Sequence, residues 1–225
     1  MKIIFVFFAA AFLSRVRNFA DVVKVSIPAA IHVLILIAEK DLGGALIFYI
    51  TYLVILYVST RKESYLVLGT GALAAGAVLA YKLFYHVRVG TGGWFGMGFC
   101  EGTPEKIPVS KTDFIFSAIC EEMGVFFGIC IILVEISCFI MFINISLKIE
   151  NRFYKLTALG LSVEYMFQVF LTIGGVTKFI PSTGVTLPLV SYGGSSVTST
   201  LILFAIIQGL YVINNKRGDD DEAES

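Results

Sequence analysis

Asp113 is the residue whose type and position most suggest chemistry. It ends a polar, glycine-rich stretch at 87–113 and directly precedes an apolar run that begins at Phe114. A carboxylate at such a boundary could cap the N-terminus of the following helix, or it could act in catalysis. Its position alone does not decide between these two roles.

The segment 181–196 is the second region that could carry a functional site. It contains two prolines and three glycines within a long apolar run, so a straight helix is interrupted there. A broken helix exposes backbone N–H groups, and Ser191, Ser195 and Ser196 add hydroxyls. We predict a re-entrant turn that lines an external cavity. The alternative is a plain loop that leads into a helix.

These residues must be positioned by helices that lie in a bilayer. Of the 225 residues, 57% are hydrophobic and 15% are charged, and the mean hydropathy is +0.85. No ordinary soluble domain has this composition. Six or seven hydrophobic segments are present, at about 2–13, 22–39, 42–59, 64–86, 114–147, 154–176 and 186–214. The sequence therefore predicts an all-α, polytopic membrane protein with about six to seven transmembrane helices.

The first of these segments is ambiguous. A span needs about 20 mostly apolar residues, and the run at 2–13 is shorter than that. Lys2, followed by apolar residues and then Ser14, is typical of a secretory signal peptide. The rival interpretation is a spanning helix whose start is missing.

Basic residues indicate the orientation of the helices. Ten of the 17 Lys and Arg residues cluster at alternate loops: Arg15, Arg17, Lys24, Arg61, Lys62, Lys148, Arg152, Lys155, Lys216 and Arg217. Short loops rich in Lys and Arg stay on the cytoplasmic side. The regions 40–43, 87–113 and 177–190 are therefore expected on the external side. We expect one transmembrane domain over 1–214 and an acidic cytoplasmic tail over 215–225.

Composition also excludes several functional classes. Five of the 17 acidic residues lie in the last seven positions, so the rest of the chain is only mildly basic and a nucleic-acid partner is not expected. The four cysteines contain no CxxC pair, which supports neither a disulfide framework nor a zinc site. Membrane lipid is the expected environment.

Four motifs carry a resemblance to a known family. They are Lys40-Asp41-Leu42-Gly43-Gly44-Ala45, Gly93-Trp94-Phe95-Gly96-Met97-Gly98, Lys111-Thr112-Asp113-Phe114-Ile115-Phe116 with Glu121-Glu122-Met123-Gly124, and the run from Ile180 to Ser196. In order, they are similar to Q-P-D-L-G-T-A, G-G-x-x-G-K-G, H-T-D-F-I-F…E-E-L-G and P-x-T-G-(V/L)-T-L-P-(L/F)-V-S-Y-G-G-S-S. The chain thus resembles the SEDS proteins, which are of the FtsW/RodA/SpoVE type.

This resemblance implies both a fold and a function. SEDS proteins typically have ten spanning helices, and this chain resembles roughly the C-terminal three-fifths of one. Lys2-Ile3-Ile4-Phe5 resembles the continuation of the family's S-E-F-x-K helix, which argues against a signal peptide. The implied activity is peptidoglycan glycosyltransfer, in which lipid II is polymerised at the outer face of the bacterial cytoplasmic membrane, usually beside a class B penicillin-binding protein. A non-enzymatic lipid II carrier and an inactive remnant are the alternatives.

The resemblance also implies roles for individual residues. Asp113 matches the family's aspartate and is the expected general base, because a sugar hydroxyl is a poor nucleophile. The departing pyrophosphate calls for cationic side chains or a divalent cation such as Mg²⁺ or Mn²⁺; no metal ligand is assigned and no organic cofactor is expected. Lys111 stands where the family usually has His, and its charge would keep Asp113 ionised. The expected substrate-binding residues are Lys111, Lys106, Glu101, Asp41, Arg88, Ser191, Gly193, Gly194 and Ser195.

Several acidic residues have alternative interpretations. Asp41 could simply end one helix and cap the next. Glu121 lies about two turns inside the expected span 114–147, where it would line a cavity or support the structure. Glu135 and Glu164 lie in otherwise apolar runs, where pairing between helices or a protonated state is the expected explanation.

Overall fold

The computed structural model describes residues 2–16, 18–61, 67, 98, 115–177, 180 and 183–223. Its long described elements are all helices: α1 (Lys2–Leu13), α2 (Phe19–Ala38), α3 (Leu42–Thr60), α5 (Ile115–Lys148), α6 (Arg152–Val176) and α7 (Gly194–Ala223). Five of them, α2, α3, α5, α6 and α7, are long and apolar enough to cross a membrane, whereas α1 is shorter. The all-α prediction is confirmed for these residues. The expected segment 64–86 lies outside the described part, apart from Val67.

Local sequence explains where several helices begin. Asn18 precedes α2 and forms a capping box with Asp21. Asn151 caps α6 by accepting hydrogen bonds from the backbone N–H groups of Phe153 and Tyr154. The last helix begins at Gly194, eight residues after the start of the hydrophobic segment 186–214. The reason is that residues 183–193 adopt irregular backbone, in which Leu189 has a positive φ of 58°.

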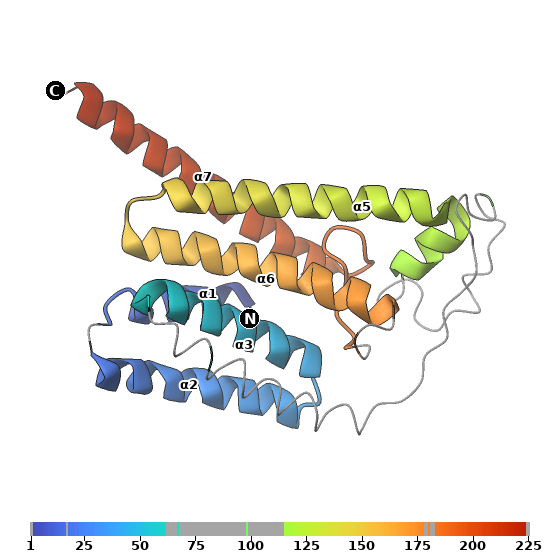
Figure 1. The fold of residues 1–225 in the computed structure, drawn as a ribbon, viewed down its shortest axis with the longest axis horizontal. Helices are drawn as coiled ribbons and strands as arrows, with labels where there is room; N and C mark the ends of the chain where they lie inside the picture. Colours follow the sequence, from blue (N-terminus) through green and yellow to red (C-terminus); the bar gives the residue numbers. More distant parts are fainter. Residues whose placement is uncertain are drawn as a thin grey trace.

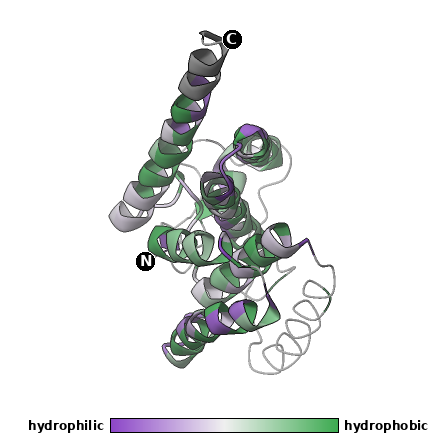
Figure 2. Cartoon of the chain, turned by 90° about the vertical axis from the view of Figure 1, so that its left-hand side faces the viewer, coloured by the Kyte–Doolittle hydropathy of each residue, from purple (hydrophilic) through white to green (hydrophobic). Residues whose placement is uncertain are grey.

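Helix α6 is the centre of the bundle. It packs against α1, α3, α5 and α7, and α2 joins through α1 and α3 (Figure 1). The part of α7 that ends at the C-terminus projects beyond the other helices. Large apolar side chains are exposed on the outside, especially on α2 and α5. Hydrophobic residues make up most of the helices (Figure 2). This arrangement suits a bundle whose outer surface faces lipid.

Helix α5 is not the single straight span that the apolar run 114–147 predicted. Gly124 has φ 86° and ψ 166°, a backbone conformation that is essentially restricted to glycine. The short arm 115–123 therefore folds back beneath the long part 125–148 (Figure 1). A Cβ atom on Gly128 would lie 2.6 Å from Cys120 Sγ and 3.2 Å from Phe116 Cζ, which shows how closely the arm packs.

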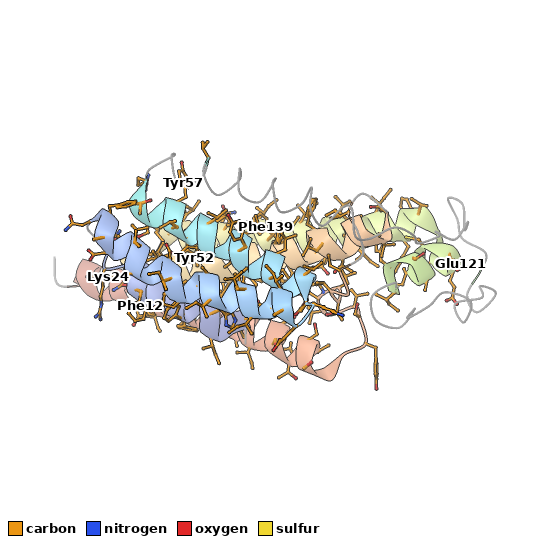
Figure 3. All side chains as sticks on the ribbon, turned by 90° about the horizontal axis from the view of Figure 1, so that it is seen from below. Phe12, Lys24, Tyr52, Tyr57, Glu121 and Phe139 are labelled. Atoms are coloured by element: carbon orange, nitrogen blue, oxygen red, sulfur yellow. The ribbon has the colours of Figure 1, made fainter. Side chains whose placement is uncertain are left out.

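The fold-back changes the position of Glu121. Figure 3 shows Glu121 on the short arm, near one end of the molecule. Its side chain is buried, with 8% exposed. Glu121 is therefore not two turns inside a long straight span, as the continuous apolar run had suggested.

Candidate functional site

Five of the predicted site residues fall outside the part of the chain that the structure describes. They are the expected base Asp113 and the expected substrate-binding residues Arg88, Glu101, Lys106 and Lys111. Their roles stay predictions. The structure describes the other five predicted site residues, which are Asp41 and, in the 181–196 segment, Ser191, Gly193, Gly194 and Ser195.

Asp41 is the N-cap of α3. Its Oδ1 accepts a 2.8 Å hydrogen bond from the backbone N–H of Gly44. A Cβ atom on residue 44 would collide with this carboxylate, so a larger residue there would displace the cap. The capping interpretation of Asp41 is confirmed, and its role in substrate binding stays a prediction.

The start of α3 lies directly against the irregular segment 183–193. A Cβ atom on Gly43 would lie 2.8 Å from the carbonyl oxygen of Thr183 and 2.9 Å from Thr183 Cβ. It would also collide with the side chain of Val185. Two motifs that are about 140 residues apart therefore meet in space, and the absence of a side chain at Gly43 allows them to do so.

Helix α6 holds the irregular segment through side-chain hydrogen bonds. Thr172 Oγ1 donates to the carbonyl oxygen of Val185 at 2.9 Å. Gln168 Nε2 donates to the carbonyl oxygen of Thr186 at 2.8 Å. Inside the segment, Ser191 Oγ accepts a 2.8 Å hydrogen bond from the backbone N–H of Leu187. Side chains of α6 and of the segment itself thus form hydrogen bonds with backbone groups that lack a helical partner, as buried peptide groups require.

A polar cavity of about 380 Å³ lies beside this segment. We call it the Lys2–Glu164 cavity. Its lining comes from α1, α6, the irregular segment and α7: Lys2, Ile3, Glu164, Tyr165, Gln168, Thr186, Gly193, Ser195, Ser196, Ser199, Thr200 and Leu203. Two predicted site residues, Gly193 and Ser195, belong to this lining. Ser191, Gly194 and Asp41 do not.

Hydrogen bonds connect the walls of the Lys2–Glu164 cavity. Lys2 Nζ donates to Gln168 Oε1 at 2.7 Å. Through its Nε2 donation to Thr186, Gln168 links α1 to the irregular segment. Thr186 Oγ1 and Ser196 Oγ lie 2.8 Å apart, which continues the connection into α7. The cavity is therefore built by one network across four elements.

Two buried acids lie near this network. Glu135 of α5 accepts a hydrogen bond from the Tyr165 hydroxyl of α6, so the expected pairing between helices is confirmed for Glu135. Glu164 is 4% exposed and lines the cavity, and its Oε2 has no hydrogen-bond partner among the described residues. Sequence reasoning did not assign Lys2, Glu164 or Gln168 to a site. Glu164 and Gln168 were marked only as polar residues within an apolar segment, whereas Lys2 also belonged to the stretch that resembles the family's S-E-F-x-K helix.

Metal ligands are not gathered in this part of the chain. Within the described residues, no group of three His, Cys, Asp or Glu side chains could hold a metal ion. The expected Mg²⁺ or Mn²⁺ therefore stays a prediction.

Comparisons with known proteins agree with the four motifs. Residues 80–216 match the FtsW/RodA/SpoVE family, described as cell cycle proteins. Peptidoglycan glycosyltransferase RodA of Mycobacterium tuberculosis is 35% identical over 221 residues, which cover 87% of this chain and 46% of that protein. The chain thus spans about half the length of this relative.

Two solved structures have similar folds. Rod shape determining protein RodA of Thermus thermophilus matches with a TM-score of 0.69 and 28% identity, over 94% of this chain and 62% of that chain. A chain from a peptidoglycan synthase complex that coordinates polymerization and crosslinking also has a TM-score of 0.69, at 24% identity, over 92% of this chain and 66% of that chain. The second likeness concerns the fold alone.

Proposed function

We propose that the chain acts in peptidoglycan synthesis as a glycosyltransferase, because it belongs to the FtsW/RodA/SpoVE family of cell cycle proteins. The substrate would be lipid II, polymerised into glycan strands at the outer face of the cytoplasmic membrane. The family match over 80–216 carries this proposal, because it includes both Asp113 and the 181–196 segment. The name of the M. tuberculosis relative supports it.

Asp113 is the proposed general base. In glycosyl transfer, the acceptor hydroxyl attacks the anomeric carbon of the donor sugar, and the bond from that carbon to the pyrophosphate oxygen breaks. The hydroxyl becomes a competent nucleophile when a carboxylate accepts its proton as the new bond forms. Lys111, two residues before Asp113, would keep the carboxylate ionised and therefore able to accept that proton.

Cationic groups would stabilise the leaving group. The lipid pyrophosphate departs with concentrated negative charge, which needs positive charge nearby in the transition state. Arg88, Lys106 and Lys111 are the proposed cations, with Glu101 beside them in the same polar stretch. A bound Mg²⁺ or Mn²⁺ would supply the same stabilisation.

The described structure supports the proposal through the position of its cavity. A polar cavity inside an apolar bundle is where irregular backbone is tolerated at membrane depth. The lining includes Gly193 and Ser195 from the 181–196 segment. By the distribution of basic residues, this end of the bundle is external, which would place the cavity on the side where lipid II is polymerised. We therefore propose that residues 183–193 are the re-entrant turn of the site.

A class B penicillin-binding protein is the proposed partner. It would crosslink the strands that this protein polymerises. A similar fold occurs in a peptidoglycan synthase complex, which is consistent with such an association.

Reconstitution with purified lipid II tests the proposed activity. Because the chain spans about half of its M. tuberculosis relative, we would assay the chain alone and a fusion that supplies the remaining part of that relative. Glycan polymers should form without ATP or an ion gradient. Movement of lipid II across the vesicle membrane without any polymer would favour the carrier function instead.

A further inference from the structure

We infer that the short arm 115–123 of α5 positions Asp113 for the reaction, and that Gly124 and Gly98 are the positioning residues that fix the arm. This inference rests on the proposed function, in which Asp113 is the general base. It gives a role in the reaction to two glycines, which have no side chain to take part in the chemistry.

The chain enters the short arm directly after Asp113. The arm begins at Ile115, two residues further on. Consecutive Cα atoms are about 3.8 Å apart, so the Cα atom of Asp113 is within about 7.6 Å of the Cα atom of Ile115. The place where the arm begins therefore limits where the carboxylate can be.

Gly124 sets the direction of the arm. Its φ of 86° and ψ of 166° reverse the chain between the arm and the long part of α5, and few residues other than glycine adopt this conformation. In a continuous helix, Ile115 would lie about 14 Å beyond Gly124 along the axis, on the side away from the long part. The reversal instead brings the start of the arm back alongside the long part.

Close packing holds the arm in this position. Phe116 and Glu121 of the arm are buried, with 6% and 8% exposed. The absence of a side chain at Gly128 lets Phe116 and Cys120 approach the long part. Because Phe116 is the second residue of the arm, this contact holds the end of the arm that follows Asp113.

Gly98 anchors the opposite end of the arm. Its backbone N–H donates a 3.1 Å hydrogen bond to the carbonyl oxygen of Glu122. A carbonyl group in the last turn of a helix has no partner within that helix, so a donor from outside satisfies it. Gly98 has a φ of 113°, a conformation that favours glycine. The glycine-rich motif 93–98 and the motif that contains Asp113 therefore meet at the arm.

The two ends of the arm also tether the residues between Gly98 and Ile115. In the helical arm, Ile115 and Glu122 are about 10 Å apart along the axis. The intervening residues include Asp113, Lys106 and Lys111. The stretch that carries the proposed base and two of the proposed cations is thus attached at both ends to one element. Such attachment favours the fixed geometry that a reaction between two bound sugars needs.

A double-mutant cycle tests whether Gly124 acts through Asp113. The kinetics of lipid II polymerisation would be measured on whichever form, the chain alone or the fusion, is active. Gly124→Ala should lower kcat about tenfold or more and change KM by less than about threefold, because a displaced base slows the reaction while substrate binding is retained. Combined with Asp113→Asn, Gly124→Ala should lower kcat no further, because the base that it positions is already absent.

Two other glycine variants separate positioning from folding. Gly98→Ala strains the second anchor and leaves α5 unchanged, so it tests the same role even where Gly124→Ala disturbs folding. Its kcat should also fall about tenfold or more, and only when Asp113 is present. Gly209→Ala is the control, because its Cβ atom would meet nothing within 4 Å. Its kcat should equal that of the wild type.

A reversible crosslink tests the position of the arm itself. With the other three cysteines changed to serine, oxidation of the Gly128→Cys variant would join position 128 to Cys120 and hold the arm folded back. The oxidised and reduced forms should have kcat values within about threefold of each other. A loss of kcat on oxidation that a reductant restores would overturn the inference, because the arm would then have to leave this position.

The kinetic results can also overturn the inference. They do so if Gly124→Ala and Gly98→Ala polymerise lipid II at the wild-type rate, or if Gly124→Ala and Asp113→Asn act independently and together lower kcat about 10³-fold. Polymerisation by the wild type would leave the proposed function standing in both cases. Absence of polymer from both wild-type forms would instead contradict the proposed function, and the inference with it.

Discussion

The Lys2 ammonium donates a 2.7 Å hydrogen bond to Gln168 Oε1, which joins two residues that are 166 positions apart. Gln168 is 6% exposed, and its Nε2 donates a hydrogen bond to the carbonyl oxygen of Thr186. One side chain of α6 therefore fixes both a cation at the cavity and the backbone of the irregular segment.

Replacing Gln168 tests this double role. Gln168→Leu leaves the Lys2 ammonium without its acceptor and the Thr186 carbonyl without its donor. Removing one partner of a buried hydrogen bond costs about 1–3 kcal/mol, so the melting temperature of the purified protein should fall. Gln208→Leu is the matched control, because Gln208 is an exposed residue of α7. Equal melting temperatures for the two variants would show that Gln168 does not have this role.

A pair of glycine substitutions tests the contact between α3 and the irregular segment. Alanine favours a helix over glycine by about 1 kcal/mol. Gly209→Ala should follow this rule, because its Cβ would meet nothing within 4 Å. Gly43→Ala should instead lower the melting temperature, because its Cβ would collide with Thr183 and Val185. If both variants were equally stable, the two motifs would not be in close contact.

A disulfide tests the fold-back of α5. In a continuous helix, residues 120 and 128 would be about 12 Å apart along the axis, too far for a disulfide. In the structure, a Cβ atom on Gly128 would lie 2.6 Å from Cys120 Sγ. In a background with the other three cysteines changed to serine, Gly128→Cys should therefore form a disulfide with Cys120 on oxidation. Non-reducing electrophoresis after cleavage between the two positions would detect it, and its absence would favour a straight helix.

The fold-back also shows what the sequence could not predict. The run 114–147 is apolar apart from a few residues such as Glu121 and Glu135, and glycine is common in membrane helices. Gly124 ends the motif that begins at Glu121, but neither this motif nor the composition of the run indicated that the chain reverses direction there. Gly124 has a backbone conformation that other residues avoid, and Gly128 makes room for Cys120. Hydrophobicity predicts that a segment is in the membrane. It does not predict a reversal of direction within the segment.

The candidate site was predictable where residues form local motifs. The 181–196 segment was expected to break the helix because of its prolines and glycines, and residues 183–193 do adopt irregular backbone. Asp41 was recognised as a possible cap from its place between two apolar runs. In contrast, Lys2, Gln168 and Glu164 meet only through tertiary packing. Their sequence separation gave no indication that they share a cavity.

Chemical labelling tests the proposed orientation. A cysteine introduced at Gly102 should react with an impermeant thiol reagent that is added outside intact cells, because the stretch 87–113 is expected to be external. A cysteine at Asn151 should not react, because basic residues flank that loop on the cytoplasmic side. The background would again lack native cysteines. Labelling of both positions, or of Asn151→Cys alone, would contradict the orientation.

The most direct test of the proposed function is lipid II polymerisation by the Asp113→Asn variant. Asparagine keeps the size of the side chain and most of its helix-capping ability, but it cannot accept the proton of the attacking hydroxyl. Membrane insertion should be unchanged, and the polymerisation rate should fall by at least about 10²-fold in whichever form, the chain or the fusion, polymerises lipid II. A near wild-type rate for Asp113→Asn, together with misfolding of Asp113→Ala, would instead make Asp113 a helix cap and contradict its assignment as the catalytic base.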